Sequence, residues 1–131
     1  LDNILQKKRI EKIYNFSLLN SVPNRELPSI YNKHNIFVFT SLIEGFGNVL
    51  IEAMSCGLPC LAFSNWGPEA IIDGKTGFWV DDEWEMVEKI KLLISDYSLY
   101  EKMSRASRER AVEYDGRNNI HIFENLIDSV I

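Results

Sequence analysis

Residues 41–59 read Ser-Leu-Ile-Glu-Gly-Phe-Gly-Asn-Val-Leu-Ile-Glu-Ala-Met-Ser-Cys-Gly-Leu-Pro, and this stretch decides the fold. The apolar run at 36–39 just before it predicts a strand that is buried on both faces. A helix is expected to begin near Asn48, a favourable N-cap residue, and to end at 57–59, Gly-Leu-Pro. The apolar run at 60–63 predicts the next strand. Strand, turn, helix and strand in this order make a βαβ unit, whose strands pair in parallel.

The glycine-containing turn before this helix favours an anionic or hydroxyl-rich ligand. Gly45 and Gly47 carry no Cβ, so the backbone can approach a ligand closely. The first N–H groups of a helix lack intrahelical acceptors and lie at the positive end of its dipole, which suits a phosphate. Glu44 precedes the glycines, where its carboxylate can accept hydrogen bonds from hydroxyls. Glu52 follows one turn beyond Asn48, on the same face of the helix.

The two glutamates and the residues around them resemble a known motif. Glu44 to Pro59 resembles the donor-site motif of retaining GT-B-fold glycosyltransferases of family 4. The resemblance continues through residues 67–80, Gly-Pro-Glu-Ala-Ile-Ile-Asp-Gly-Lys-Thr-Gly-Phe-Trp-Val, where the family has a Gly-Pro-x-Glu block and an Asp-Gly-x-x-Gly turn. It covers roughly residues 14–96. It implies a doubly wound α/β fold, a Rossmann-like parallel sheet with helices on both faces, which is half of a GT-B fold.

The resemblance also implies a function and a set of roles. The activity is transfer of a hexosyl or N-acetylhexosaminyl group from a nucleotide-diphosphate donor, with retention, without a metal or other cofactor, and in surface glycan biosynthesis. Glu44 is the expected catalytic residue. The donor is expected to contact the amides of the turn and of the helix N-terminus, and its ribose to contact Glu52. The expected donor-binding residues are Gly45, Phe46, Gly47, Asn48, Val49 and Glu52.

Other interpretations of the same residues remain open. Glu44 and Glu52 can be a helix cap and a surface charge with no ligand. The chain can also be a nucleotide-sugar binding or regulatory module that never catalyses. The presence of a companion acceptor domain would separate that hypothesis from an enzyme. A nucleotide-sugar epimerase of similar architecture is a third hypothesis, which the Glu-Gly-Phe-Gly run at 44–47 disfavours.

Composition excludes several classes of protein. The chain has 131 residues, the length of a single domain, with 46% hydrophobic and 25% charged residues. A net charge of −5 argues against a nucleic-acid binder, which would show a basic face. Cys56 and Cys60 are expected to be reduced thiols in a cytoplasmic protein, and the cysteines and histidines form no metal-binding pattern.

The rest of the chain predicts further alternation of strands and helices. The expected elements are a surface helix at 1–13, a strand at 14–19, a short helix at 26–33, a helix starting at Pro68, a turn at 73–77, a strand at 78–80, and helices from 81, at 99–114 and at about 117–131. In the helix from residue 81, the inward face is expected to hold Trp84, Val87, Ile90, Leu93 and Ile94. Tyr31, in the short helix, is expected to serve packing alone.

The N-terminal side of the chain departs from the family pattern. A GT-B enzyme has two such domains, with the acceptor bound by the N-terminal one, and basic residues that meet the diphosphate lie well before the glutamate motif. Only 43 residues precede Glu44, and none matches that loop. The single domain, residues 1–131, is therefore expected to be truncated on its N-terminal side and inactive alone. Its expected partners are a nucleotide sugar and an acceptor domain in the same or a companion chain, through which it would reach the inner face of the membrane.

Overall fold

The fold was determined as a computed structural model, which describes residues 17, 19, 21–43, 45, 47–66 and 69–117, with the side chain of Trp66 excepted. Glu44 and Phe46 lie outside the described residues. So do the predicted helix at 1–13, all of the predicted strand at 14–19 except Ser17 and Leu19, and nearly all of the predicted helix at 117–131.

Three short strands form a parallel sheet in the described part of the chain. They are β1 (Phe37–Phe39), β2 (Cys60–Phe63) and β3 (Gly77–Val80), in the spatial order β1-β2-β3. The register places Phe37 opposite Cys60 and Cys60 opposite Gly77. The predicted βαβ unit is confirmed, because α3 (Asn48–Ser55) connects the parallel pair β1 and β2.

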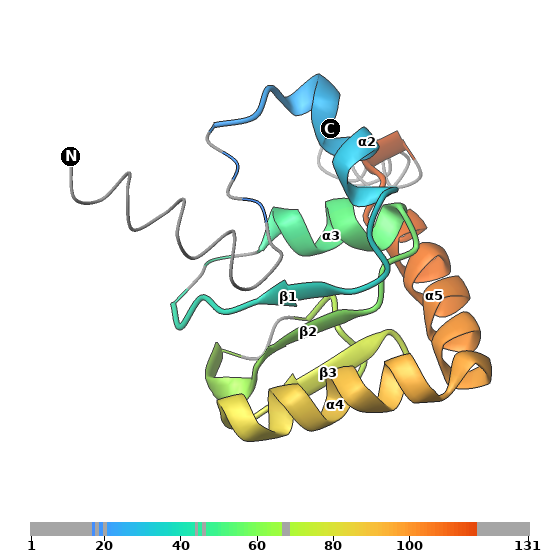
Figure 1. The fold of residues 1–131 in the computed structure, drawn as a ribbon. Helices are drawn as coiled ribbons and strands as arrows, with labels where there is room; N and C mark the ends of the chain where they lie inside the picture. Colours follow the sequence, from blue (N-terminus) through green and yellow to red (C-terminus); the bar gives the residue numbers. More distant parts are fainter. Residues whose placement is uncertain are drawn as a thin grey trace, which may run out of the picture.

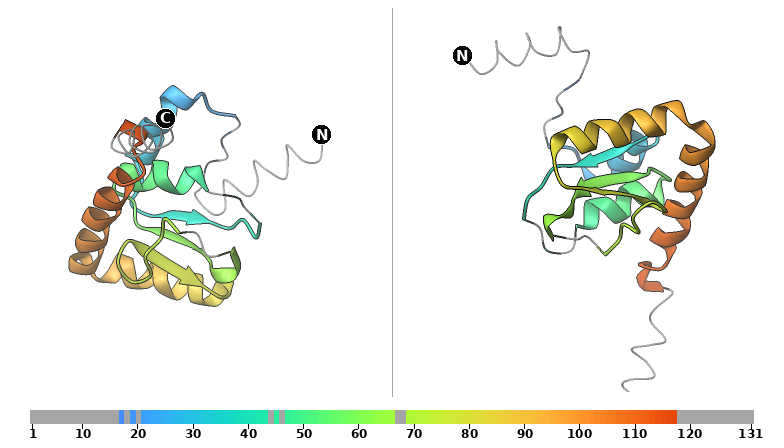
Figure 2. Two further views of the ribbon diagram at one scale, coloured as in Figure 1. Left: turned by 180° about the vertical axis from the view of Figure 1, so that it is seen from behind. Right: turned by 90° about the horizontal axis from the view of Figure 1, so that it is seen from below.

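Helices cover both faces of this sheet. Figure 1 shows α3 on one side of the strands and α4 (Glu83–Ser95) on the other. Helix α5 (Tyr97–Val112) runs past one end of the sheet and packs on α3 and α4, an arrangement that also holds in the two views of Figure 2. This is the predicted doubly wound, Rossmann-like architecture.

The sheet divides the core into two clusters because alternate side chains of a strand point to opposite faces. On the α3 side the fully buried residues include Leu50, Ala53, Met54, Cys60 and Ala62. On the α4 side the buried residues include Leu61, Phe78, Val80, Met86, Leu93 and Met103. The apolar pattern of this helix predicts a stripe of Val49, Leu50, Ala53 and Met54. The last three are fully buried, as predicted, whereas Val49 is only partly buried.

The predicted burial of the first strand on both faces is wrong. Val38 is 39% exposed, and its neighbours Phe37 and Phe39 are only partly buried. Within the described residues β1 lies at an edge of the sheet, so the α4 side of this strand is covered incompletely. An apolar run does not reveal this, since a central and an edge strand can carry the same residues.

Helix α3 ends where the sequence predicts. Gly57 adopts φ +80°, and its N–H donates to the Met54 carbonyl at 2.8 Å, while the Leu58 N–H donates to the Ala53 carbonyl at 3.1 Å. These two bonds form a Schellman motif. Helix α5 supports the same turn, because Ser104 Oγ donates to the Gly57 carbonyl at 2.6 Å and Arg108 donates to the Cys56 carbonyl at 3.1 Å.

The predicted turn and strand after the second glycine block are confirmed, but the helix before them is not. Glu69 and Ala70 form a turn, so no helix continues from Pro68 into the described residues. Residues 73–77 then turn, with Gly74 at φ +70°, and lead into β3. The buried Thr76 hydroxyl accepts the Ile72 N–H at 2.8 Å, which holds this turn closed.

The predicted inward face of α4 is largely wrong. Trp84 is 81% exposed, Ile94 is 74% exposed, and Val87 is also exposed. The buried residues are Met86 and Leu93, with Ile90 packed beside them. Apolar residues occur on two sides of this helix, so the 3.6-residue period alone is compatible with either side facing the sheet.

The remaining helix boundaries differ from expectation by a few residues. The short helix α2 covers Leu27–Tyr31 and follows a 3₁₀ turn, η1, at Asn24–Glu26. Helix α5 begins at Tyr97 rather than at residue 99, because the Asp96 side chain accepts the Leu99 N–H at 2.9 Å and caps the helix. It ends at Val112, two residues before the predicted end.

Candidate functional site

The N-terminus of α3 lies at the carboxyl edge of the sheet, directly after β1 and its loop. Gly47 precedes the helix with φ +72° and ψ +49°, a left-handed conformation that a residue with a Cβ adopts rarely. The predicted N-cap, Asn48, is therefore wrong by one position, since Asn48 is the first helical residue and Gly47 is the cap. The left-handed cap was not predictable from residue preference, which favours Asn at this position.

The backbone amides at this helix start are available to a ligand. The first hydrogen bond of the helix runs from the Leu50 N–H to the Gly47 carbonyl at 2.8 Å. The amides of Asn48 and Val49 precede it, at the positive end of the helix dipole, and Asn48 is exposed. A phosphate group is the ligand that such a helix start accommodates best.

Glu52 lies on the same helix, one turn beyond these amides. Its side chain is exposed, and its Oε2 accepts a hydrogen bond from the Tyr31 hydroxyl at 3.0 Å. The expectation that Tyr31 serves packing alone is therefore incomplete. Its ring does pack edge-on against Phe37, with ring centroids 5.8 Å apart, but its hydroxyl reaches the candidate site. The Leu27-x-x-x-Tyr31 spacing, which resembles a pattern of the family, singled out Tyr31 but did not indicate a contact with Glu52.

A small cavity opens beside this pair. Its volume is about 210 Å³, and it lies between η1, α2 and the side of α3. Besides Tyr31 and Glu52 it is lined by Asn24, Leu27, Pro28, Ser55 and Cys56. The exposed carboxylate of Glu52 therefore faces a space that a small polar group can enter.

Burial and the neighbouring carboxylate keep Tyr31 protonated. The pKa of Tyr31 is raised from 10.0 to about 12. The largest cause is loss of solvent on burial, and the hydrogen bond to Glu52 and the negative charge of Glu52 contribute in the same direction. All three effects disfavour the phenolate. Tyr31 is thus a hydrogen-bond donor throughout the neutral and mildly alkaline range.

This raised pKa predicts a loss of stability in alkali. Between pH 10 and about 12 the unfolded chain releases the Tyr31 proton and the folded chain retains it, so the free energy of unfolding falls as pH rises through this window. Below pH 10 the contribution is fully present. Urea unfolding across this range should show a steeper fall for the wild type than for Tyr31→Phe, and parallel curves for the two proteins would contradict the assignment.

A second cavity lies at the carboxyl edge of the sheet, where the loops after the three strands meet. Its volume is about 460 Å³, and its lining includes Thr40, Phe63 and Asp81, which lie at or just after the ends of β1, β2 and β3. The Asn65 side chain donates to the Leu42 carbonyl at 2.8 Å and so joins the loops after β1 and β2. Ligands of open α/β sheets bind at this edge.

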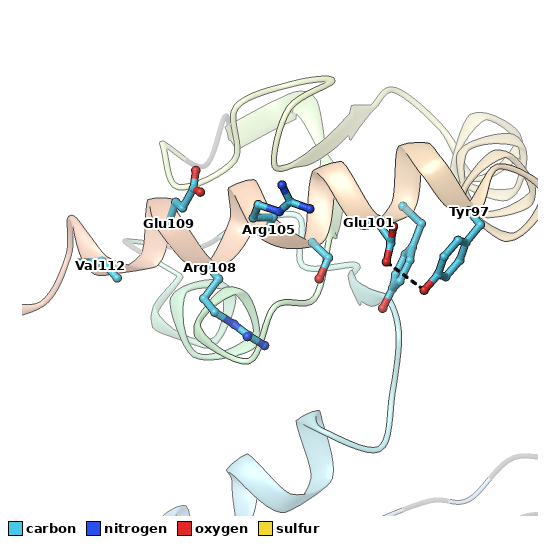
Figure 3. Close-up of a pocket in the computed structure, with 8 residues that line it drawn as sticks. Tyr97, Glu101, Arg105, Arg108, Glu109 and Val112 are labelled. Atoms are coloured by element: carbon cyan, nitrogen blue, oxygen red, sulfur yellow. Dashed lines mark hydrogen bonds between the residues drawn. The ribbon is translucent and has the colours of Figure 1, made fainter.

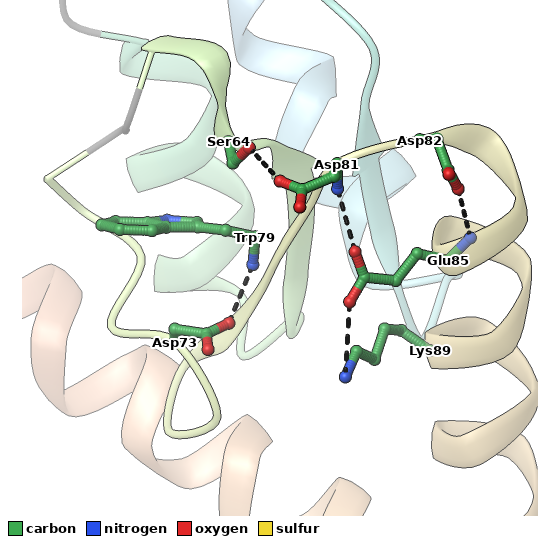
Figure 4. A network of polar contacts seen from close by, with 7 residues as sticks. All are labelled: Ser64, Asp73, Trp79, Asp81, Asp82, Glu85 and Lys89. Atoms are coloured by element: carbon green, nitrogen blue, oxygen red, sulfur yellow. Dashed lines mark hydrogen bonds and ion pairs between the residues drawn. The ribbon is translucent and has the colours of Figure 1, made fainter.

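Polar contacts fix the loop after β3 at the same edge, as Figure 4 shows. Ser64 Oγ donates to Asp81 at 2.5 Å, and the Asp81 N–H donates to Glu85 at 2.9 Å. Asp82 caps α4 by accepting the Glu85 N–H at 2.8 Å. These acidic side chains are engaged in structural hydrogen bonds.

A third cavity, of about 530 Å³, follows the exposed side of α5 away from the α3 N-terminus (Figure 3). Two of the residues that line this cavity are hydrogen-bonded to each other: the Tyr97 hydroxyl donates to Glu101 at 3.0 Å. None of the predicted site residues lines this cavity.

The structure brings together part of the predicted site. The start of α3 holds Gly47, Asn48 and Val49, and Glu52 lies one turn further along the same helix. Gly45 lies exposed in the preceding loop. Glu44 and Phe46 lie outside the described residues, so the predicted catalytic role of Glu44 and the predicted donor contact of Phe46 stay predictions. Among the described residues, no group of three or more His, Cys, Asp and Glu side chains could hold a metal ion.

Comparison with known protein families shows to which family this chain belongs. The family model described as glycosyl transferases group 1 matches residues 4–110. The chain belongs to this family. The α/β fold is that of a group 1 glycosyltransferase domain with a GT-B fold.

Individual relatives agree with this assignment. The capsular polysaccharide biosynthesis glycosyltransferase CapM of Staphylococcus aureus is 41% identical over 85 residues, which is 63% of this chain and 22% of CapM. The C-terminal domain of the group 1 glycosyltransferase LpcC from Francisella tularensis superposes with a TM-score of 0.70 at 25% identity, covering 87% of this chain and 63% of that one. The HepE protein of Anabaena, solved with UDP-glucose, superposes with a TM-score of 0.79 at 24% identity, over 97% of this chain and 36% of HepE.

The chain therefore spans about a fifth of the length of CapM. No helix in the described part of the chain is both long and apolar enough to cross a membrane.

Proposed function

We propose that this chain provides the nucleotide-sugar donor site of a retaining glycosyltransferase of family 4, as the C-terminal half of a GT-B enzyme. The observation that carries the proposal is the position of Glu52 one turn from the amides at the start of α3. Four residues of helix correspond to a rise of about 6 Å. A nucleoside diphosphate offers phosphate oxygens and ribose hydroxyls at a comparable separation.

Each described residue then has a role in donor binding. The amides of Asn48 and Val49 would bind the diphosphate, and Glu52 would accept hydrogen bonds from the ribose hydroxyls. The amides of Gly45 and Gly47 would contact the sugar. Glu44 and the amide of Phe46 would complete the sugar site from the same loop, with Glu44 as the catalytic residue.

The chemistry of these residues suits sugar transfer without a metal. When the bond between the anomeric carbon and the diphosphate breaks, negative charge grows on the departing phosphate oxygens. Helix-start amides directed at those oxygens stabilise this charge more strongly in the transition state than in the ground state. Fixing the sugar hydroxyls and the ribose at two separate points orients the anomeric carbon toward the acceptor.

The acceptor is assigned to a different part of the enzyme. The chain covers 22% of CapM and 36% of HepE, and HepE, which shares this fold, was solved in complex with UDP-glucose. We propose that the acceptor site belongs to a companion N-terminal domain, that this domain provides any contact with the inner face of the membrane, and that the chain alone transfers no sugar. The similarity to CapM, a capsular polysaccharide biosynthesis glycosyltransferase, supports a role in surface glycan synthesis. We further propose that the group transferred is hexosyl or N-acetylhexosaminyl and that transfer occurs on the cytoplasmic side.

Glu52→Ala is expected to reduce the affinity for the donor. A hydrogen bond to a charged group contributes about 1.5–3 kcal/mol, which corresponds to a loss of about 10- to 150-fold. The measurement is a calorimetric titration of the 131-residue chain with a panel of uridine- and guanosine-diphosphate sugars.

The matched control is Glu101→Ala, which removes another exposed glutamate that accepts a tyrosine hydroxyl, on α5. This variant should bind every ligand as the wild type does. Equal affinities of the wild type and Glu52→Ala, or no binding of any nucleotide sugar by the wild type, would disprove the proposal.

A further inference from the structure

Tyr31 connects the core of the domain to the carboxylate of Glu52. On one side its ring packs edge-on against Phe37 of β1, with the ring planes at 76°. On the other side its hydroxyl donates to Glu52 Oε2 at 3.0 Å. Phe37 belongs to the sheet, so the position of the phenol is fixed by the core rather than by the flexible surface.

We propose that Tyr31 is a positioning residue, which holds the Glu52 carboxylate in the orientation that accepts the ribose hydroxyls of a nucleoside diphosphate. This inference rests on the proposed function, because it presumes that Glu52 binds the ribose. A glutamate on an exposed helix face has several rotatable bonds and samples many orientations. A hydrogen bond from a fixed donor restricts these orientations before the ligand arrives, which lowers the entropy lost on binding.

The geometry leaves Glu52 able to bind a second partner. An ionised carboxylate has two oxygens with about four acceptor sites, and Tyr31 occupies one of them, on Oε2. The Glu52 side chain is exposed and lines the 210 Å³ cavity together with Tyr31. Oε1 is therefore available to the ribose hydroxyls while Tyr31 holds the other oxygen.

Burial on the core side also keeps the donor in its required form. The pKa of Tyr31, raised to about 12, leaves the hydroxyl protonated at physiological pH. The Tyr31 hydroxyl is therefore able to donate to Glu52 at neutral pH.

The test compares Tyr31→Phe with the wild type for two kinds of ligand. The probes are UDP and GDP, and the 2′,3′-dideoxy forms of both, which lack the ribose hydroxyls. The substitution removes the hydroxyl and preserves the ring that packs on Phe37. Affinity for the ribose-containing nucleotide that the wild type binds should fall about fivefold, the equivalent of one ordinary hydrogen bond. Affinity for its dideoxy form should not change.

Two controls isolate positioning from a structural effect. Tyr97→Phe removes a tyrosine-glutamate hydrogen bond of the same 3.0 Å length on α5 and should leave all affinities unchanged. The double variant Tyr31→Phe/Glu52→Ala should bind no more weakly than Glu52→Ala alone, because Tyr31 acts through Glu52.

The outcomes separate this inference from the proposed function. If Glu52→Ala weakens ribonucleotide binding and Tyr31→Phe does not, the positioning role is disproved and the donor site stands. If Tyr31→Phe weakens both forms equally, the effect is structural and the inference is again wrong. If the wild type binds the ribose and dideoxy forms equally, or binds neither, Glu52 does not bind the ribose. The positioning role of Tyr31 is then disproved as well.

Discussion

Gly77→Ala should destabilise this domain by about 3 kcal/mol or more, the upper range for inserting a methyl group where no space exists. A Cβ at position 77 would lie 1.8 Å from the carbonyl oxygen of Cys60 and 2.8 Å from its carbonyl carbon. These are backbone atoms of the central strand β2, so no side chain can rotate away. Relief requires β2 and β3 to separate at the register pair Cys60–Gly77.

Urea unfolding of the purified variant measures this effect, and Gly116→Ala serves as the control. A methyl group at Gly116 would have no heavy atom of the described residues within 4 Å, and this residue has no positive φ, so its substitution should change the free energy of unfolding by less than about 0.5 kcal/mol. A Gly77→Ala variant as stable as Gly116→Ala would show that β2 and β3 do not approach each other as described.

Leu93→Ala and Ile94→Ala should differ strongly although the two residues are adjacent and similar in size. Leu93 is 3% exposed and packs in the core cluster on the α4 side of the sheet, whereas Ile94 is 74% exposed. Removing a buried leucine side chain costs about 2–5 kcal/mol, because apolar contacts are lost and a cavity remains. An exposed side chain without such contacts contributes within about 0.5 kcal/mol.

Denaturant unfolding of both variants under the same conditions decides which side of α4 faces the sheet. Both substitutions leave alanine in a helix, so helix propensity favours each variant slightly and cannot produce a loss. Comparable destabilisation by the two substitutions would contradict the orientation of α4 in this structure.

The turn and helix ends show how far local sequence information reaches. Gly57 and the residues around it predicted the end of α3, because a left-handed residue after a helix is a local requirement that glycine meets. The cap at the start of α3 was predicted one residue too late. Asn48 satisfies the general preference for a cap, but the chain turns into the helix through the left-handed Gly47. Gly47 and Asn48 are both compatible with the cap position of a helix, and the path of the chain from β1 places Gly47 there.

The candidate site was likewise predictable in part. The spacing of Asn48 and Glu52 was enough to place the amides and the carboxylate on one helix face, because helical periodicity is a local property. The contact between Tyr31 and Glu52 joins residues 21 positions apart. It depends on how α2 packs against β1 and α3, and the Leu-x-x-x-Tyr spacing gave no direction for the hydroxyl.

Local sequence was sufficient, within the described residues, to predict the βαβ unit, its parallel pairing, and the grouping of amides and Glu52 at the start of α3. These features follow from apolar periodicity, glycine placement and short-range helix geometry. Three features required the tertiary structure: Val38 is exposed, Leu93 rather than Ile94 faces the core, and Tyr31 reaches Glu52. The physical reason is that burial and long-range hydrogen bonds depend on which surfaces meet, and one segment of sequence is compatible with several such surfaces.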